Sequence, residues 1–212
     1  LTKEEASKNG IDNFSRSLLV LPSGEIWVAT QSSGIVVLGK DKKIIRNIRQ
    51  PLPAGIEHLN TDNKGRIWAA TFGGLYVMDS RAEKIEKLTQ VALNDAANKY
   101  NYILQLNDGR MLAASNSGLQ TITEKNGKFS VSFLKTGKDN DVYLTLYQNK
   151  KGLLYLSRAF KGFFTGIADG DTVVNQKDHP SKSSIKCFSF ENDSTLWIGS
   201  TVGLIKFNEK TQ

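Results

Sequence analysis

Residues 62–75 read DNKGRIWAATFGGL, which predicts a turn, a strand with a large central residue, a glycine turn and the start of another strand. Four further segments repeat this order: GEIWVAT from Gly24, GRMLAAS from Gly109, GLLYLSR from Gly152 and STLWIGS from Ser194. Their central residues are Trp27, Trp68, Leu112, Tyr155 and Trp197, separated by 41, 44, 43 and 42 residues. Because this period is the length of one four-stranded propeller blade, the repeat decides the fold class.

A second glycine follows each central residue at a nearly constant distance. These glycines are Gly34, Gly74, Gly118, Gly162 and Gly203. Glycine allows the positive φ that a tight turn between antiparallel strands requires. The apolar residue after each glycine is expected to begin a strand that faces a neighbouring sheet.

The sequence therefore predicts an all-β fold, a single β-propeller over residues 1–212 with about five four-stranded antiparallel blades. Blade boundaries are expected near 11–50, 51–95, 96–137, 138–178 and 179–212. The innermost strands are expected at Ser17–Leu21, Ile56–Thr61, Tyr102–Leu106, Val142–Gln148 and Ile185–Phe190. Outer strands are expected at Lys43–Ile48, Lys84–Val91, Lys128–Lys135 and Thr172–Gln176.

The fifth blade has no sequence for a fourth strand, because the chain stops at Gln212. Either residues 1–6 return to supply that strand and close a five-bladed ring, or the chain is a fragment of a larger propeller of about seven blades. We favour the fragment. The remaining blades of the parent protein, or a second copy of the chain, would then cover the first and last blades, since exposed large apolar residues forgo about 1.5–3 kcal/mol each.

Composition agrees with a soluble β protein, since no apolar run approaches the roughly 18 residues that indicate a membrane span. Leu1–Lys8 is polar and does not resemble a signal peptide, so we expect a piece of a longer protein whose targeting signal lies elsewhere. The lone Cys187 excludes an internal disulfide, and its apolar surroundings predict a buried, inert thiol. The net charge of +7 comes from dispersed lysines, which favours solubility and edge protection over a polyanion or nucleic-acid site.

Motifs for catalysis are missing from the sequence. The only histidines are His58, on an expected inner strand with a structural role, and His179, in an expected solvated loop. No hydrolase elbow, zinc-protease, Walker or dinucleotide motif is present, so no catalytic residue, metal or cofactor is predicted. The acidic residues at 139–141 and 169–171 lack the spacing of a calcium loop, and we interpret them as solvated turns.

The aromatic residues at the centre of the repeats admit two interpretations. Trp27, Trp68, Tyr155 and Trp197 have side chains that can stack on sugars. Their identical place in each repeat instead favours packing between adjacent blades.

The repeats resemble the two-component regulator propeller family, whose consensus is approximately D-x-x-G-x-L/I-W-I/V-G/A-T followed by G-L. Residues 59–75 fit this pattern almost throughout, and residues 196–204 nearly as well, whereas the fourth copy has Tyr155 for Trp and Arg158 for Thr. The resemblance covers about residues 11–210. It implies the periplasmic sensor region of a membrane-anchored hybrid histidine kinase of the Bacteroidetes type, with oligosaccharides as typical signals and the kinase in regions not present here.

A ligand site is expected on loops at one mouth of the ring, where the residues most unlike the repeat gather. The candidate ligand-binding residues are Tyr100, Asn101, Asp141, Tyr143, Arg158, Phe160 and Lys161. Their aromatic, amide and charged groups are of the types that bind a glycan. The sensor module is the preferred function, and two alternatives stay open: a propeller enzyme like the streptogramin lyases, or a structural propeller that binds a protein partner.

Overall fold

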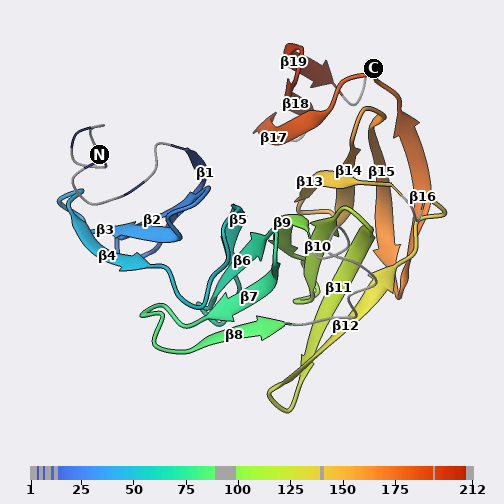
Figure 1. Cartoon of the computed structure of the whole chain (residues 1–212). Helices are drawn as coiled ribbons and strands as arrows, with labels where there is room; N and C mark the ends of the chain where they lie inside the picture. The colour runs from blue at the N-terminus through green and yellow to red at the C-terminus, as the bar shows by residue number, and fades with distance from the viewer. Residues whose placement is uncertain are drawn as a thin grey trace. The chain divides into compact units, whose positions relative to one another are not determined.

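The computed structural model describes residues 14–88, 99–138, 141–192 and 194–208, together with Glu4, Ser7 and Ile11. The chain divides into two compact units, Leu1–Gln105 and Leu106–Gln212. All nineteen elements named in the described residues are β-strands (Figure 1). The same residues contain no helix with the length and apolar character needed to cross a bilayer.

The strands form five antiparallel sheets. The first consists of β1 (Ser15–Val20), β2 (Ile26–Thr30), β3 (Ile35–Leu38) and β4 (Ile44–Ile48). The second consists of β5 (Ile56–Thr61), β6 (Ile67–Thr71), β7 (Gly74–Met78) and β8 (Ile85–Leu88). The third consists of β9 (Tyr100–Gln105), β10 (Met111–Ser115), β11 (Gly118–Lys125) and β12 (Lys128–Leu134). The fourth consists of β13 (Tyr143–Gln148), β14 (Leu153–Arg158), β15 (Gly162–Asp169) and β16 (Thr172–His179). The fifth consists of β17 (Ile185–Asn192), β18 (Thr195–Ser200) and β19 (Gly203–Asn208).

Within every sheet the strands follow one another in chain order, as in a propeller blade. The predicted fold class is confirmed: the chain is an all-β propeller with five blades, one for each copy of the repeat. Four blades have four strands, and the fifth has three in the residues described. Residues 1–6, which we considered as a source of its fourth strand, lie outside the described residues except for Glu4.

The strand boundaries differ from expectation at several ends. The outer strand expected at Lys84–Val91 begins at Ile85 as β8, which is observed to Leu88, and its expected end lies outside the described residues. The outer strand expected at Thr172–Gln176 continues to His179 as β16. Its register with β15 shifts between Thr165 and Ile167. This irregularity allows β16 to continue beyond the residues whose apolar and polar side chains alternate in the sequence.

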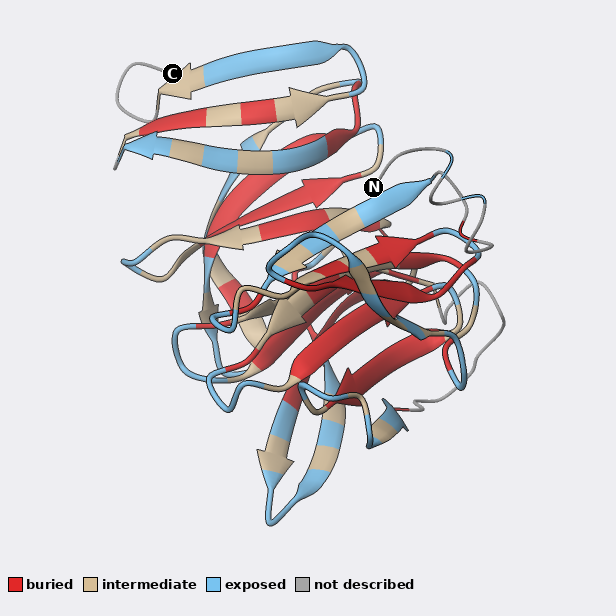
Figure 2. Cartoon of the chain, turned by 90° about the vertical axis from the view of Figure 1, so that its left-hand side faces the viewer, coloured by how far each residue is buried: buried red, intermediate tan, exposed pale blue. Residues whose placement is uncertain are grey.

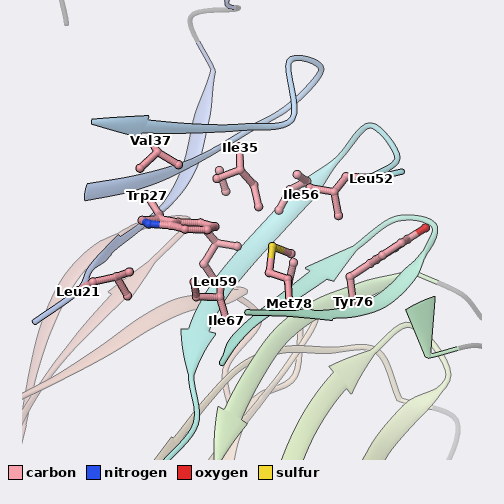
Figure 3. Packing of buried hydrophobic residues seen from close by; sticks show 12 residues of the cluster. Leu21, Trp27, Ile35, Val37, Leu52, Ile56, Leu59, Ile67, Tyr76 and Met78 are labelled. Carbon is pink, nitrogen blue, oxygen red and sulfur yellow. The ribbon is translucent and has the colours of Figure 1, made fainter. Parts of the chain in front are cut away.

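In the first unit, the aromatic residue of the first repeat packs between two sheets. Trp27 of β2 is fully buried and lies among side chains of the second sheet, including Ile56 and Met78 (Figure 3). Ile35 and Val37 of the first sheet line the same cluster. The position of the tryptophan in the repeat is therefore the position at which one sheet meets the next.

Each tryptophan also takes part in the same three-group arrangement. The indole N–H of Trp68 donates to Asp62 Oδ2 at 2.9 Å, and Arg66 Nε donates to the same oxygen at 2.7 Å. Glu25 and Arg46 surround Trp27 in the same way, and Glu191 and Lys206 surround Trp197. In all three cases the cation lies 5.0–5.7 Å from the centre of the indole ring. The acidic residue before the strand thus orients the indole and its cation.

The second unit has an aromatic core around the fourth repeat. Tyr155 of β14 packs against Phe163 of β15 and against Phe188 and Phe190 of β17. Its hydroxyl oxygen is buried and has no hydrogen-bond partner in the part of the chain that is described. The tyrosine therefore fills the tryptophan position by its ring alone.

The buried residues gather in strands (red in Figure 2). The second strands of the sheets are mostly buried. The apolar residue after each turn glycine is also buried in four copies: Ile35, Leu75, Leu119 and Phe163 are 0–5% exposed. The fifth copy departs from this pattern, because Leu204 is 68% exposed and its neighbour Val202 is 79% exposed. The turn before β19 and the start of β19 therefore present apolar side chains to solvent.

Candidate functional site

The turn between the second and third strands of each blade is closed by a hydroxyl group in four of the five copies. Its O–H group donates to the carbonyl oxygen of the turn glycine, with O···O distances of 2.7–2.9 Å, in the pairs Thr30–Gly34, Thr71–Gly74, Ser115–Gly118 and Ser200–Gly203. The fourth copy has Arg158 at this position and cannot make the bond. This turn is therefore held by different interactions.

The guanidinium of Arg158 bridges two carboxylates instead. Its Nη1 lies 3.2 Å from Asp141 Oδ2, and its Nη2 lies 2.7 Å from Asp178 Oδ1. Its Cζ also lies 5.3 Å from the ring centre of Phe164, a buried residue of β15. The Arg158 side chain is only 11% exposed, so these contacts fix its position.

Asp141 forms hydrogen bonds with both ends of the turn between β14 and β15, Arg158 and Lys161. Its Oδ1 accepts a hydrogen bond from Lys161 Nζ, while its Oδ2 accepts one from Arg158. Burial raises the pKa of the Asp141 carboxyl, but the hydrogen bonds and charges of Lys161 and Arg158 outweigh burial, and the net shift is downward. Asp141 is thus ionised at neutral pH and compensates part of the positive charge.

Phe160 occupies the tip of the turn in an unusual backbone conformation. Among the described residues it is the one aromatic residue with a positive φ, at 57°. Its backbone N–H donates to Ser184 Oγ at 3.1 Å, and its side chain is 73% exposed. A bulky residue in the left-handed region is strained, and such strain is concentrated at binding sites.

Gly162 brings a second segment against this turn. Its φ is 74°, and a Cβ atom here would lie 2.6 Å from the backbone N of Ser181 and closer still to the carbonyl O of His179. Only glycine leaves room for this approach. Residues 180–182 therefore lie close to the turn and line the same pocket as Phe160.

The two segments enclose an open pocket of about 610 Å³. The residues that line it are Arg158, Phe160, Lys161, Pro180, Ser181 and Lys182. Three of the sequence-predicted residues, Arg158, Phe160 and Lys161, thus meet in one site. Asp141 lies directly behind them through its two ion pairs.

The remaining predicted residues lie elsewhere. Tyr143 is fully buried at the start of β13, where its hydroxyl forms a hydrogen bond with Thr136 Oγ1 at 2.9 Å. Tyr100 and Asn101 were expected in a loop, but they are the first two residues of β9, and Tyr100 is only 2% exposed. Their strand begins earlier than the apolar pattern indicated, and neither tyrosine ring presents a face to solvent.

Two single residues differ from expectation. Cys187 is exposed rather than buried: a register shift after Ile185 interrupts the alternation that predicted its burial, and it pairs with Gly199 of β18. His179 is not a loop residue but ends β16, where its ring stacks on Phe163 at 4.5 Å. Its side chain therefore belongs to the aromatic core of the second unit.

His58 has a packing role in the first unit. Its ring stacks on Tyr102 at 3.6 Å between centroids, and its Nδ1 accepts a hydrogen bond from the Ile103 N–H. Burial lowers the pKa of His58 from 6.5 to about 4, with a small opposing effect of the Ile103 hydrogen bond. The imidazole is thus neutral at physiological pH.

The acidic segments show no metal-binding geometry where they are described. Asp139 and Asn140 lie outside the described residues. Asp171 forms an ion pair with Lys135 at 3.0 Å, and the Asp169 carbonyl accepts a hydrogen bond from Thr172. No group of three or more His, Cys, Asp or Glu side chains close enough to hold a metal ion occurs in the described ranges.

Comparison with known proteins finds similarity in structure only. No family model matches the chain, and no curated protein matches its sequence. The fold is similar to the extracellular domains of two putative hybrid two-component systems of B. thetaiotaomicron, with TM-scores of 0.75 and 0.72 at 16% and 20% identity. The alignments cover 93% and 92% of this chain but only 26% and 27% of those domains, so the chain spans about a quarter of their length. Virginiamycin B lyase from Staphylococcus aureus is also similar, with a TM-score of 0.70 at 16% identity over 92% of this chain and 70% of the lyase.

Proposed function

We propose that the chain is a non-catalytic, ligand-binding propeller module of an extracytoplasmic sensor in a hybrid two-component histidine kinase. In this proposal the module lies in the periplasm, binds an oligosaccharide, and relays binding to the kinase through a membrane-spanning segment outside this sequence. The supporting observation is the fold that the chain shares with extracellular domains of two such systems over nearly its whole length. The repeat pattern of residues 59–75 supports the same family.

The ligand is proposed to bind at the pocket of the fourth blade. This is the one copy in which the turn hydroxyl is replaced by a guanidinium, and the same turn carries the exposed ring of Phe160. A sugar ring offers an apolar face to an aromatic side chain and hydroxyl groups to charged donors. Phe160 would supply the aromatic face, and Arg158 and Lys161 the donors.

The module is further proposed to need additional blades of the parent protein. Leu204 is exposed although its four counterparts in the repeat are buried, which indicates a face built for packing. Another blade of the parent chain is the occupant that the repeat favours, and a second copy of this chain is the alternative. The length of the similar sensor domains agrees with further blades.

An enzyme of the lyase type is the second candidate, because the fold also matches virginiamycin B lyase. The histidines argue against it: His58 stacks on Tyr102 and His179 stacks on Phe163. Incubation of the chain with quinupristin, which was crystallised with the S. aureus lyase, tests this alternative. Cleavage that is lost in a His58→Ala or His179→Ala variant would favour the enzyme.

The sensor proposal is tested by calorimetric titration of the chain with a panel of neutral and acidic oligosaccharides. Binding by at least one member is expected, and Phe160→Ala should weaken it about tenfold through loss of stacking. Val202→Ala is the matched control, because Val202 is an exposed residue of the equivalent turn in the fifth blade. Equal weakening by both variants, or no binding by any sugar, would contradict the proposal.

A further inference from the structure

The pocket of the fourth blade is lined by three cations and by no acidic residue. Arg158, Lys161 and Lys182 contribute side chains to its surface. Two carboxylates lie next to the cluster, Asp141 behind Arg158 and Lys161, and Asp178 beside Arg158 and Lys138. Counting Lys138, four cations meet two carboxylates, and the site has a net charge of about +2 at neutral pH.

The two carboxylates hold the cations in place without neutralising the pocket. Both Asp141 oxygens are occupied by Lys161 and Arg158, and this side chain is only 10% exposed. Lys182, another lining residue, forms no ion pair with any carboxylate of the described ranges. Lys161 keeps 58% of its side chain exposed, so it has surface left for a ligand.

The geometry of the walls limits the size and shape of the ligand group. Phe160 offers an exposed apolar ring, and Pro180 offers a second apolar surface across the pocket. Gly162 fixes the separation of these walls, because its Cα packs directly against the backbone of residues 179–181. A flat group with an apolar face and one acidic substituent matches this combination.

We propose that the pocket selects an acidic sugar, whose carboxylate or sulfate lies between Lys161 and Lys182 and whose ring lies on Phe160. This inference rests on the proposed sensor function and names the ligand class of the same site. Arg158 is a positioning residue in this scheme, because both of its terminal nitrogens are bound to carboxylates. The two lysines supply the charge that discriminates between acidic and neutral sugars.

The test is an NMR titration of the ¹⁵N-labelled chain with four probes: glucose, glucuronic acid, glucose 6-sulfate and inorganic sulfate. The two acidic sugars are expected to shift the amide signals of Phe160, Lys161 and Lys182 at concentrations at which glucose does not. The Lys161→Met and Lys182→Met variants should each weaken this binding about tenfold. Binding should also weaken as salt is raised, because the cations are exposed.

Lys125→Met is the matched control, since Lys125 is an exposed lysine at the end of β11 and should leave the affinity unchanged. The relative response to glucuronic acid and glucose 6-sulfate distinguishes a carboxylate site from a sulfate site. Equal shifts with inorganic sulfate alone would overturn the role assigned to the sugar ring. Binding of neutral sugars at Phe160, with no effect of salt or of either lysine variant, would overturn this inference and leave the sensor function standing. No response here and no binding in the oligosaccharide panel would overturn both.

Discussion

At the scale of single residues, the hydrogen bonds around the repeat position differ from copy to copy. The indole N–H groups of Trp27, Trp68 and Trp197 all donate to a carboxylate, whereas the Tyr155 hydroxyl is buried without a partner among the described residues. An unsatisfied buried hydroxyl costs about 1–3 kcal/mol. Among the copies with a polar group at this position, the fourth is therefore the one that lacks a hydrogen bond within the described residues.

Replacement of Tyr155 by Phe removes that hydroxyl and keeps the ring. We expect Tyr155→Phe to raise the free energy of unfolding by about 1 kcal/mol, as measured by urea denaturation. Tyr143→Phe is the control: the Tyr143 hydroxyl is bonded to Thr136, and its removal should lower stability by about 1 kcal/mol. A loss of stability in Tyr155→Phe would mean that the hydroxyl is satisfied in solution.

His58 gives the stability a specific dependence on pH. Because its pKa in the folded chain is about 4, below the ordinary 6.5, the unfolded chain binds a proton first as the pH falls. The contribution of neutral His58 to the free energy of unfolding is therefore fully present above pH 6.5 and is lost progressively down to about pH 4. The loss between pH 7 and pH 4.5 is about 2 kcal/mol.

His58→Gln should remove this slope, as followed by urea unfolding at a series of pH values. His179→Gln is a useful comparison, because burial and the charge of Lys177 lower the pKa of His179 as well. If the pH dependence of stability persists in His58→Gln and disappears in His179→Gln, it arises from His179 and the prediction is wrong.

Part of the candidate site was predictable at this scale. Arg158, Phe160 and Lys161 were singled out because they break the repeat, and the structure brings them together. Asp178 and residues 180–182 were missed, because they come from β16 and the turn after it, about twenty residues later, and carry no periodic signal. The partners of the tryptophans were missed for the same reason: Arg46 and Lys206 lie on other strands than the indoles they approach.

At the scale of strands and turns, the glycines with positive φ differ in what surrounds them. Gly162 and Gly65 both have φ near 74°, but a Cβ atom at Gly162 would collide with backbone, whereas one at Gly65 would meet nothing within 4 Å. The two positions separate backbone strain from steric collision. They therefore form a matched pair for substitution.

We expect Gly65→Ala to cost about 1–2 kcal/mol, the strain of a left-handed alanine. Gly162→Ala should cost at least about 2 kcal/mol more, because residues 179–181 must move. Thermal unfolding of both variants checks the difference. Equal losses of stability would show that the backbone of residues 179–181 moves away from residue 162 at little cost, and that this side of the pocket is not rigid.

The strands themselves were largely predictable, because alternation and glycine spacing indicate them locally. The ends were less so: β16 runs on to His179 through an irregularity, and β9 begins at Tyr100. Both extensions depend on pairing with a neighbouring strand. Pairing of this kind is a tertiary property that a local pattern does not contain.

At the scale of the whole molecule, the period of the repeat predicted an all-β propeller and the number of blades in this sequence. It could not predict which blade faces are covered, since burial of Leu75 and exposure of Leu204 arise from the same motif. Whether this position is buried depends on the presence of a neighbouring sheet that packs against it. The apolar face around Leu204 therefore leads to a prediction for the entire chain.

Leu204→Glu is expected to change the free energy of unfolding by less than about 0.5 kcal/mol, because the side chain is already exposed. It should also reduce self-association in sedimentation velocity experiments, because it breaks an apolar patch. Leu75→Glu, at the equivalent but buried position, should prevent stable folding. Strong destabilisation by Leu204→Glu would show that this face is covered in solution.

The hydroxyl that closes four of the five turns has a consequence for how such proteins diversify. In the fourth copy one replacement at that position exchanges the closing hydrogen bond for ion pairs to two carboxylates, while the other four copies keep the hydroxyl bond. The sequence of one turn can thus change without altering the hydrogen bonds that close the others.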